Sequence, residues 1–408
     1  MKQILKAHES LPEKAETSPT VGDIFRKHGE VFRATHPLHP RQHKVMYDIE
    51  HCQCGEFGTH WKVCDSCGHM IKRYNSCRNP HCPGCNHIAQ TKWVNARIDD
   101  LLPVSYHHSV FTLPDLFNSL CLFNRRLMYD LLFEASSQTL LDFGHNPKRL
   151  GATIGFYGIL HTWGGQLWPH PHVHYIVTAG GINNTGKWVD PKYHATFLFP
   201  VKALSTVFRA KFLEGLKKIH PQLKFPDDLK ALADPHAFSQ WLYHEIPKEW
   251  VVFSKPPFSG PEEVVKYIGR YTHRSAISNN RIISDKDGKI EFWFKNTRKG
   301  SRWETTSLPA ATFIERFLYH VLPKQFHRIR YYGFLANGKA RSNIESIRQD
   351  MAVKSPQALT VSEKGVPCPN CEEGTMMTIL ITDGYGNVIV DNCDSETDRE
   401  VPVILDST

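Results

Sequence analysis

The sequence predicts an α+β protein in which a small cysteine-rich segment precedes a larger region of strands and helices. Short apolar or alternating runs, typical of strands, are interspersed with longer runs of helical periodicity. Between residues 51 and 87 the chain is instead rich in Cys and His and poor in aliphatic residues. This segment cannot build an apolar core of its own, so something other than hydrophobic burial must stabilise it.

The elements are expected in a definite order along the chain. Residues 20–50 carry a helical pattern with Val21, Ile24, Phe25 and Phe32 on one side. Strands are expected at 106–114, 153–163, 172–181 and 249–256, and a hairpin at 280–295 that turns at Asp287-Gly288. Helices are expected at 119–144, 201–219, 260–274 and 308–323. After about residue 345 the pattern weakens.

The composition is that of an ordinary globular protein, with 41% hydrophobic and 22% charged residues in a chain of 408. No apolar run approaches the roughly 20 residues that span a membrane. The first residues carry charges where a signal peptide needs an apolar stretch, which indicates a cytoplasmic protein without a membrane partner.

Basic residues are concentrated in one part of the chain. The formal net charge is +8, and residues 266–348 hold 17 Lys and Arg against 6 Asp and Glu. After Val390 the balance reverses to six acidic residues against one Arg. The basic stretch indicates a nucleic-acid surface, although a merely charged, solvated face is the alternative.

The cysteine-rich segment predicts structural zinc. Cys64 and Cys67 form one CxxC pair, and Cys82 and Cys85 form a second pair after 14 intervening residues. CxxC turns supply thiolate ligands in pairs, so these four cysteines are expected to fill one tetrahedral Zn²⁺ site. A redox role is the alternative, but no βαβ context surrounds the pairs. The expected ligands of a second zinc site are Cys52, His60, Cys77 and His81, whereas the C-terminal pair Cys368 and Cys371 lacks enough local partners.

A second motif that can bind metal lies in "PHPHVHYIVTAGG", residues 169–181. On a strand, alternate side chains share a face, so His172 and His174 point the same way. Gln166 could supply a third, neutral ligand, and the open positions would suit Mg²⁺ or Mn²⁺. A pair of core or surface histidines without metal is the alternative.

The expected helix at 260–274 carries two tyrosines. Tyr267 and Tyr271 are four residues apart and therefore share a helix face, with the cations Lys266, Arg270 and Arg274 beside them. Tyrosines on a helix often serve only for packing. A phenol can also attack a phosphodiester when a metal and cations hold the phosphate, which gives a phosphotyrosine that allows rejoining without ATP.

At these residues the sequence resembles the HUH (His-hydrophobic-His) single-strand endonucleases and, more closely, the two-tyrosine transposases of the IS91 family of bacterial insertion sequences. The resemblance extends to about residue 345. The stretches that carry it are "YNSCRNPHCPGC", "VFTLP", "LHTWGGQLWPHPHVH", "KPPFSGPEEVVKYIGRYTHRSAISN" and "LPKQFHRIRYYGFLAN". It implies an N-terminal helical segment (1–50), a zinc-binding domain (51–92), a catalytic domain with a central antiparallel sheet flanked by helices (100–345) and a weakly structured tail with a CxxC pair (346–408).

The resemblance also implies roles and a mechanism. His172 and His174 match the HUH ligands, Gln166 a third ligand, and Tyr267 and Tyr271 the paired nucleophiles. The protein would be a rolling-circle transposase that cleaves and rejoins single-stranded DNA through 5′-phosphotyrosine intermediates. Its partners would be single-stranded DNA at element ends and target, with host replication and helicase proteins for unwinding, in the nucleoid of a bacterial cytoplasm. No small-molecule substrate is implied.

Three other readings stay open at this point. A DNA-binding regulator without chemistry explains the charge and the cysteines but leaves the histidine strand and the tyrosine pair as accidents. A metallohydrolase needs further ligands that the sequence after residue 174 does not offer in an obvious frame. A plasmid replication initiator or relaxase would share the HUH chemistry, but the zinc segment favours a transposase.

Overall fold

The computed structural model describes most of the chain: residues 18–86, 90–91, 93–94, 97, 100–191, 198–255, 274–296, 299–336, 338, 340–351, 366–371 and 373–392. The helix expected at 260–274, with Lys266, Tyr267, Arg270 and Tyr271, lies outside these residues except for Arg274. Within this part of the chain, every helix is too short or too polar to cross a membrane.

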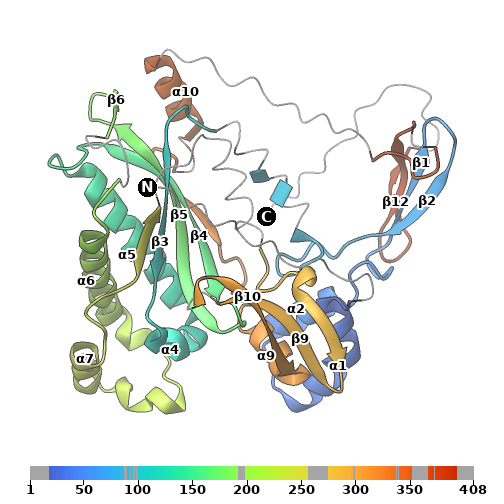
Figure 1. Cartoon of the computed structure of the whole chain (residues 1–408), viewed down its shortest axis with the longest axis horizontal. Helices are drawn as coiled ribbons and strands as arrows, with labels where there is room; N and C mark the ends of the chain where they lie inside the picture. The colour runs from blue at the N-terminus through green and yellow to red at the C-terminus, as the bar shows by residue number, and fades with distance from the viewer. Residues whose placement is uncertain are drawn as a thin grey trace.

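The structure is α+β, as predicted, and the described strands pair in three antiparallel sheets (Figure 1). The described helices are α1 (Val21–Thr35), α2 (Pro40–Glu50), α4 (Asn118–Phe123), α5 (Arg125–His145), α6 (Val201–Ile219), α7 (Pro235–His244), α9 (Ala310–Leu318) and α10 (Ala340–Asp350). The strands are β1 (Thr59–Cys64), β2 (Met70–Tyr74), β3 (Tyr106–Thr112), β4 (Thr153–Trp163), β5 (Pro169–Ile182), β6 (Trp188–Val189), β7 (Val252–Lys255), β8 (Ile282–Lys286), β9 (Lys289–Asn296), β10 (Arg302–Pro309), β11 (Ile329–Gly333), β12 (Met376–Thr382) and β13 (Val388–Asp391).

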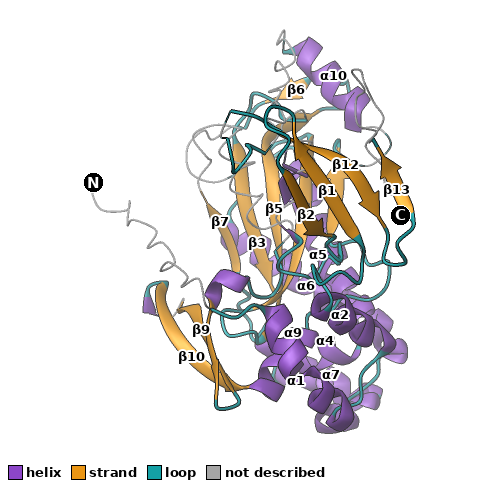
Figure 2. Ribbon diagram, turned by 90° about the vertical axis from the view of Figure 1, so that its right-hand side faces the viewer, coloured by secondary structure: helices purple, strands orange, loops and turns teal. Residues whose placement is uncertain are grey.

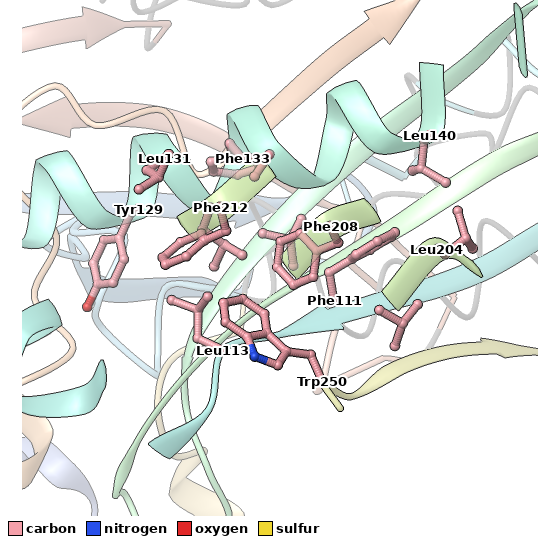
Figure 3. Close-up of a cluster of buried hydrophobic side chains, with 14 of the residues drawn as sticks. Phe111, Leu113, Tyr129, Leu131, Phe133, Leu140, Leu204, Phe208, Phe212 and Trp250 are labelled. Carbon is pink, nitrogen blue, oxygen red and sulfur yellow. The ribbon is translucent and has the colours of Figure 1, made fainter. Parts of the chain in front are cut away.

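The largest sheet has the strand order β11-β4-β5-β3-β7, with β6 paired to the end of β5. Helices α5 and α6 lie together on one face of it (Figure 1). Side chains alternate along β5, so Val173 and Tyr175 enter the core beneath these helices while His172 and His174 face the other way. Figure 3 shows Phe208 of α6 against Phe111 of β3 in this core, with Phe212 of α6 beside Phe208. The buried face therefore fixes which side the histidines occupy.

The helix predicted at 119–144 is divided into α4 and α5 at Asn124. This residue has φ −125° and ψ 41°, outside the helical region. Its side-chain amide donates to the carbonyls of Leu120 and Lys224, and its Oδ1 accepts from the Lys224 amide. Asn124 thus bonds to the segment after α6 instead of continuing the helix. Likewise, the pattern at 20–50 forms two helices, α1 and α2, with Pro40 as the first residue of α2.

A second core joins α1 and α2 to α9 and the sheet of order β10-β9-β8. The predicted side of α1 is buried there, since Val21, Ile24, Phe25 and Phe32 all lie in this cluster. The predicted hairpin turn at Asp287-Gly288 is confirmed, because both residues have the positive φ that a tight two-residue turn requires. Figure 2 shows α1, α2 and α9 together near one end of the largest sheet.

The third sheet brings a segment that follows α2 together with the last described residues of the chain. Its order is β13-β12-β1-β2, so β1 pairs with β2 on one side and with β12 on the other. The prediction of a weakly structured tail is wrong for residues 376–391, which form β12 and β13. These strands were missed because their partner β1 lies about three hundred residues upstream. Local sequence patterns do not reveal such long-range pairing.

Candidate metal and nucleic-acid site

Three histidines meet on the face of the largest sheet that lies opposite α5 and α6. His172 of β5 is paired directly with His161 of β4, and His174 follows two residues later on the same face. One ring nitrogen of each lies within 4.8 Å of the others. His161 is buried and the other two are half-buried. We call His161, His172 and His174 the histidine cluster.

Hydrogen bonds orient the rings of the two histidines predicted from the sequence. The Nδ1 atom of His172 lies 2.6 Å from the carbonyl oxygen of His170. A carbonyl only accepts, so Nδ1 carries the proton and Nε2 of the neutral ring keeps its lone pair. The Nδ1 atom of His174 lies 2.8 Å from Nε2 of His108 on β3. With this Nδ1 donating, Nε2 of His174 is also available as a ligand, the arrangement usual for metal-bound histidines.

His172 and His174 are held in their neutral form. Burial, and then the neighbouring His170, lowers the pKa of His172 to about 3. Burial, and then His161, lowers the pKa of His174 well below its usual value. Desolvation disfavours the charged imidazolium, so both rings are unprotonated at neutral pH and need not lose a proton to bind a cation.

Gln166, expected as a third ligand, lies in the turn between β4 and β5. Strands β4 and β5 are paired out to Trp163 and Pro169, and Gln166 lies in the turn beyond. His172 lies three residues from Pro169 along β5, a distance of about 10 Å on a strand. The Gln166 carbonyl accepts from Arg316. The third side chain in the cluster is His161, which sequence reasoning missed. A regular hairpin with Trp163 opposite Pro169 would put residue 161 opposite residue 171, and the register shift between His161 and Trp163 brings it opposite His172 instead, which the sequence does not reveal.

Three arginines are linked to one another near the histidine cluster. Arg274, the first described residue after the tyrosine segment, helps to lower the pKa of His174 through its charge. Its carbonyl accepts from Arg328, which is buried with its pKa lowered to about 10. Burial, and then Arg274, lowers the pKa of Arg281 to about 9. These cations add positive charge near the histidine cluster, which favours an anion such as a phosphate there.

Cysteines gather in two groups of four. The first cysteine cluster comprises Cys52, Cys77, Cys82 and Cys85. Its Sγ atoms are 3.6 Å apart between Cys52 and Cys85, and 3.5 Å between Cys77 and Cys85. In a tetrahedral site with Zn–S bonds of about 2.3 Å, neighbouring sulfur atoms are about 3.8 Å apart, so the geometry fits tetrahedral zinc. Cys82 and Cys85 also belong to the core of α1, α2 and α9, which anchors this cluster to the body.

The second cysteine cluster comprises Cys64, Cys67, Cys368 and Cys371. The predicted grouping of Cys64 and Cys67 with Cys82 and Cys85 is therefore wrong. The pairing of β1 with β12 carries Cys64 to the C-terminal CxxC pair, while Cys82 and Cys85 return to α2 and meet Cys52. Sequence spacing identified the CxxC pairs but could not tell which pairs the topology combines.

The two histidines expected in the second zinc site lie outside both cysteine clusters. Nδ1 of His60 lies 3.0 Å from Oδ1 of Asn75. Nε2 of His81 accepts from the backbone N–H of Leu322 at 3.4 Å. Burial, and then the charge of Arg328, lowers the pKa of His81 to about 3. His81 thus bonds to backbone in the interior. The prediction of His60 and His81 as zinc ligands is wrong, because both four-residue clusters consist of cysteines.

Comparisons with known proteins bear on these sites. Residues 24–113 match a family described as "Transposase zinc-binding domain", and residues 155–343 match one described as "Putative transposase". A protein of Sinorhizobium fredii named "Putative transposase y4qJ" is 43% identical over 91% of this chain and 97% of its own length. The "Transposase for insertion sequence element IS801" of Pseudomonas savastanoi pv. phaseolicola is 28% identical over 76% of this chain and 71% of its own length. No solved structure matches the chain.

Proposed function

We propose, since the chain belongs to the IS91 family of transposases with an N-terminal zinc-binding domain, that it performs rolling-circle transposition by metal-dependent cleavage and rejoining of single-stranded DNA. A transposase acts on DNA, so DNA is the partner we expect for the basic stretch at residues 266–348. In this proposal Tyr267 and Tyr271 are the nucleophiles, and host replication and helicase proteins unwind the duplex.

One observation carries the proposal: Lys255 and Arg274, the described residues on either side of the tyrosine segment, are both linked to His174 of the histidine cluster. At its start, Lys255 of β7 is paired with His108, whose ring contacts His174. At its end, the charge of Arg274 acts on His174. Tyr271 precedes Arg274 by three residues, a span of at most about 11 Å. Chain connectivity therefore supports a phenol within reach of the histidines.

The histidine cluster fits a divalent cation. Its three imidazoles place one ring nitrogen each within 4.8 Å of the others, and the hydrogen bonds at Nδ1 of His172 and His174 leave Nε2 of both rings available as ligands. A site with only nitrogen ligands favours Mn²⁺ over Mg²⁺, which prefers oxygen. When bound, the ion would supply Lewis-acid polarisation of a phosphate oxygen and stabilise the charge that develops there.

The chain's own residues would perform the remaining steps. Arg270 and Arg274 would hold the scissile phosphate by charge. One tyrosine loses its proton, its oxygen attacks phosphorus, and the bond to the 3′ oxygen breaks. The departing 3′ oxygen takes up a proton and becomes the hydroxyl that can prime replication, while the 5′ phosphate stays on tyrosine. The second tyrosine would carry out the next cleavage, and its closeness removes the cost of recruiting another nucleophile.

The proposal is tested by trapping the covalent product. The full chain is incubated with single-stranded oligonucleotides from the DNA flanking its gene, with Mn²⁺ or Mg²⁺, and the products are separated in SDS. A metal-dependent adduct is expected. Tyr267→Phe and Tyr271→Phe together should abolish it, because phenylalanine has no oxygen to attack phosphorus. His172→Ala with His174→Ala should reduce it by at least about 100-fold, a loss typical for removing charge stabilisation in a transition state.

Matched controls come from α7. Tyr243→Phe and His236→Ala change exposed residues of the same types and should leave the adduct unchanged. Persistence of the adduct without both tyrosines would refute their assignment as nucleophiles. Tight DNA binding without adduct from any flanking strand would instead favour a regulator without chemistry.

A further inference from the structure

The second cysteine cluster joins two segments that lie three hundred residues apart. Cys64 ends β1 and Cys67 follows in the turn, whereas Cys368 and Cys371 precede β12. The matched family ranges, 24–113 and 155–343, contain Cys64 and Cys67 but end before Cys368. The two CxxC pairs meet because β1 and β12 are antiparallel neighbours, with Cys64 opposite Met376.

The sulfur positions fit a tetrahedral metal centre. The Sγ atoms of Cys64 and Cys371 are 3.7 Å apart, and those of Cys67 and Cys368 are also 3.7 Å apart. These distances match the edge of about 3.8 Å expected around Zn²⁺. They are far longer than the roughly 2.05 Å of a disulfide bond. All four ligand atoms lie within 4.8 Å of one another, so one ion can reach them all.

Backbone donors surround the sulfurs in a repeated pattern. Cys64 Sγ accepts from the amides of Ser66 and Cys67, each at 3.4 Å. In the second pair, Cys368 Sγ accepts from the Asn370 amide and Cys371 Sγ from the Gly374 amide, again at 3.4 Å. Four thiolates around one Zn²⁺ carry a net charge of −2, which such N–H donors stabilise. The two CxxC turns thus have the donors that thiolate ligands need.

The close fit at Gly374 is further evidence that the two turns are built for each other. A Cβ atom there would lie 2.3 Å from Sγ of Cys64 and 2.9 Å from a carboxylate oxygen of Asp65. The same Asp65 oxygen accepts from the Thr375 amide at 2.7 Å. Each turn therefore contacts the other directly.

The third sheet has little apolar core with which to hold itself together. Its buried cluster consists of Cys64, Cys368 and Met376, with Ile71 and Cys371 packed beside it. Such a small core cannot offset the entropy of ordering four strands, and small folds of this kind depend on a metal or disulfides. In a cytoplasmic protein with free thiols, metal is the stabilising element to expect.

We propose that Cys64, Cys67, Cys368 and Cys371 bind a second structural Zn²⁺ ion, which ties the C-terminal strands β12 and β13 to β1 and β2. Four thiols bind one Zn²⁺ and release four protons, without any change of oxidation state. The proposal concerns folding of the third sheet and is independent of the cleavage chemistry proposed above.

Zinc counting on the purified full chain tests it. The wild type is expected to hold two zinc ions per chain, one in each cysteine cluster. Cys368→Ser with Cys371→Ser should reduce the count to one, and adding Cys64→Ser with Cys67→Ser should reduce it no further, since all four act as one site. Cys54→Ser, an exposed cysteine outside both clusters, should leave two. One zinc in the wild type, unchanged by Cys368→Ser with Cys371→Ser, would overturn the proposal.

A second measurement needs no variant that must fold. Native wild-type protein is treated with N-ethylmaleimide before and after a zinc chelator, and the labelled cysteines are identified by mass spectrometry. Cys67 is exposed, so only a bound metal would slow its labelling relative to Cys54. Protection of Cys67, Cys368 and Cys371 that is lost with the chelator is expected. Labelling as fast as that of Cys54 before chelation, or a Cys64–Cys371 disulfide in peptide maps, would refute the zinc centre.

Discussion

At the scale of single residues, His161 decides what kind of metal centre the largest sheet can form. With His161 the cluster has three imidazole donors, whereas Gln166 would have added an oxygen. His161→Ala is expected to weaken Mn²⁺ binding by at least about tenfold, since even outer-shell partners of a metal have effects of that size. Gln166→Ala, in the turn beyond the paired strands, should have less than about a twofold effect. Mn²⁺ titration followed by electron paramagnetic resonance measures both, and the reverse order would restore Gln166 as the third ligand.

At the scale of elements, a buried histidine next to α9 contacts the β4–β5 hairpin that carries the histidine cluster, in addition to the contact of Arg316 with Gln166. His320, just after α9, has Nε2 at 3.0 Å from the Leu167 carbonyl in the turn and Nδ1 at 3.1 Å from the Thr162 hydroxyl. The carbonyl can only accept, so Nε2 donates, and in the neutral ring Nδ1 accepts from the Thr162 hydroxyl. Burial lowers the pKa of His320 to about 4, although the hydrogen bond to the Leu167 carbonyl alone would raise it.

This contact predicts a pH-dependent loss of stability. The folded pKa of about 4 lies below the unfolded value of about 6.5, so the unfolded chain binds more protons in between. The contribution of His320 is then present above pH 6.5 and lost as the pH falls towards 4, by about 2 kcal/mol between pH 7 and pH 5. Urea unfolding at the two pH values should show that His320→Gln lowers stability at pH 7 and reduces the pH dependence. An unchanged pH dependence would contradict the assignment.

The sequence predicted elements whose evidence is local. The alternation in residues 172–181 identified β5 and the shared face of His172 and His174, and the apolar side of α1 was likewise predicted. What could not be predicted depends on partners distant in sequence. Asn124 breaks a helix by bonding to Lys224, and β12 becomes a strand only beside β1. The grouping of the cysteines failed for the same reason, because spacing cannot show which CxxC pair a sheet brings near another. Placement of Tyr267 and Tyr271 stays a prediction.

At the scale of the whole molecule, the third sheet is separate from the parts that carry the histidine cluster. Figure 1 shows β1, β2 and β12 set well apart from β4 and β5. The cores under α5 and α6 and around α1 and α9 consist of residues before 340. Ile344 and Ile347 of α10 belong to a separate small cluster with Leu102 and Phe334. Removing residues 352–408 takes away β12, β13 and two ligands of the second cysteine cluster while leaving these cores whole.

The shortened chain, residues 1–351, should therefore keep the main thermal unfolding transition and one zinc ion while losing the other. Its rate of adduct formation with single-stranded DNA should stay within about twofold of the full chain, because groups this far apart couple by no more than about 0.5 kcal/mol. Zinc analysis, a thermal scan and the adduct assay on one preparation measure all three. A tenfold slower reaction with the main transition intact would mean that the third sheet contacts DNA, and its exposed Tyr74 and Met70 on β2 would then be the first side chains to replace.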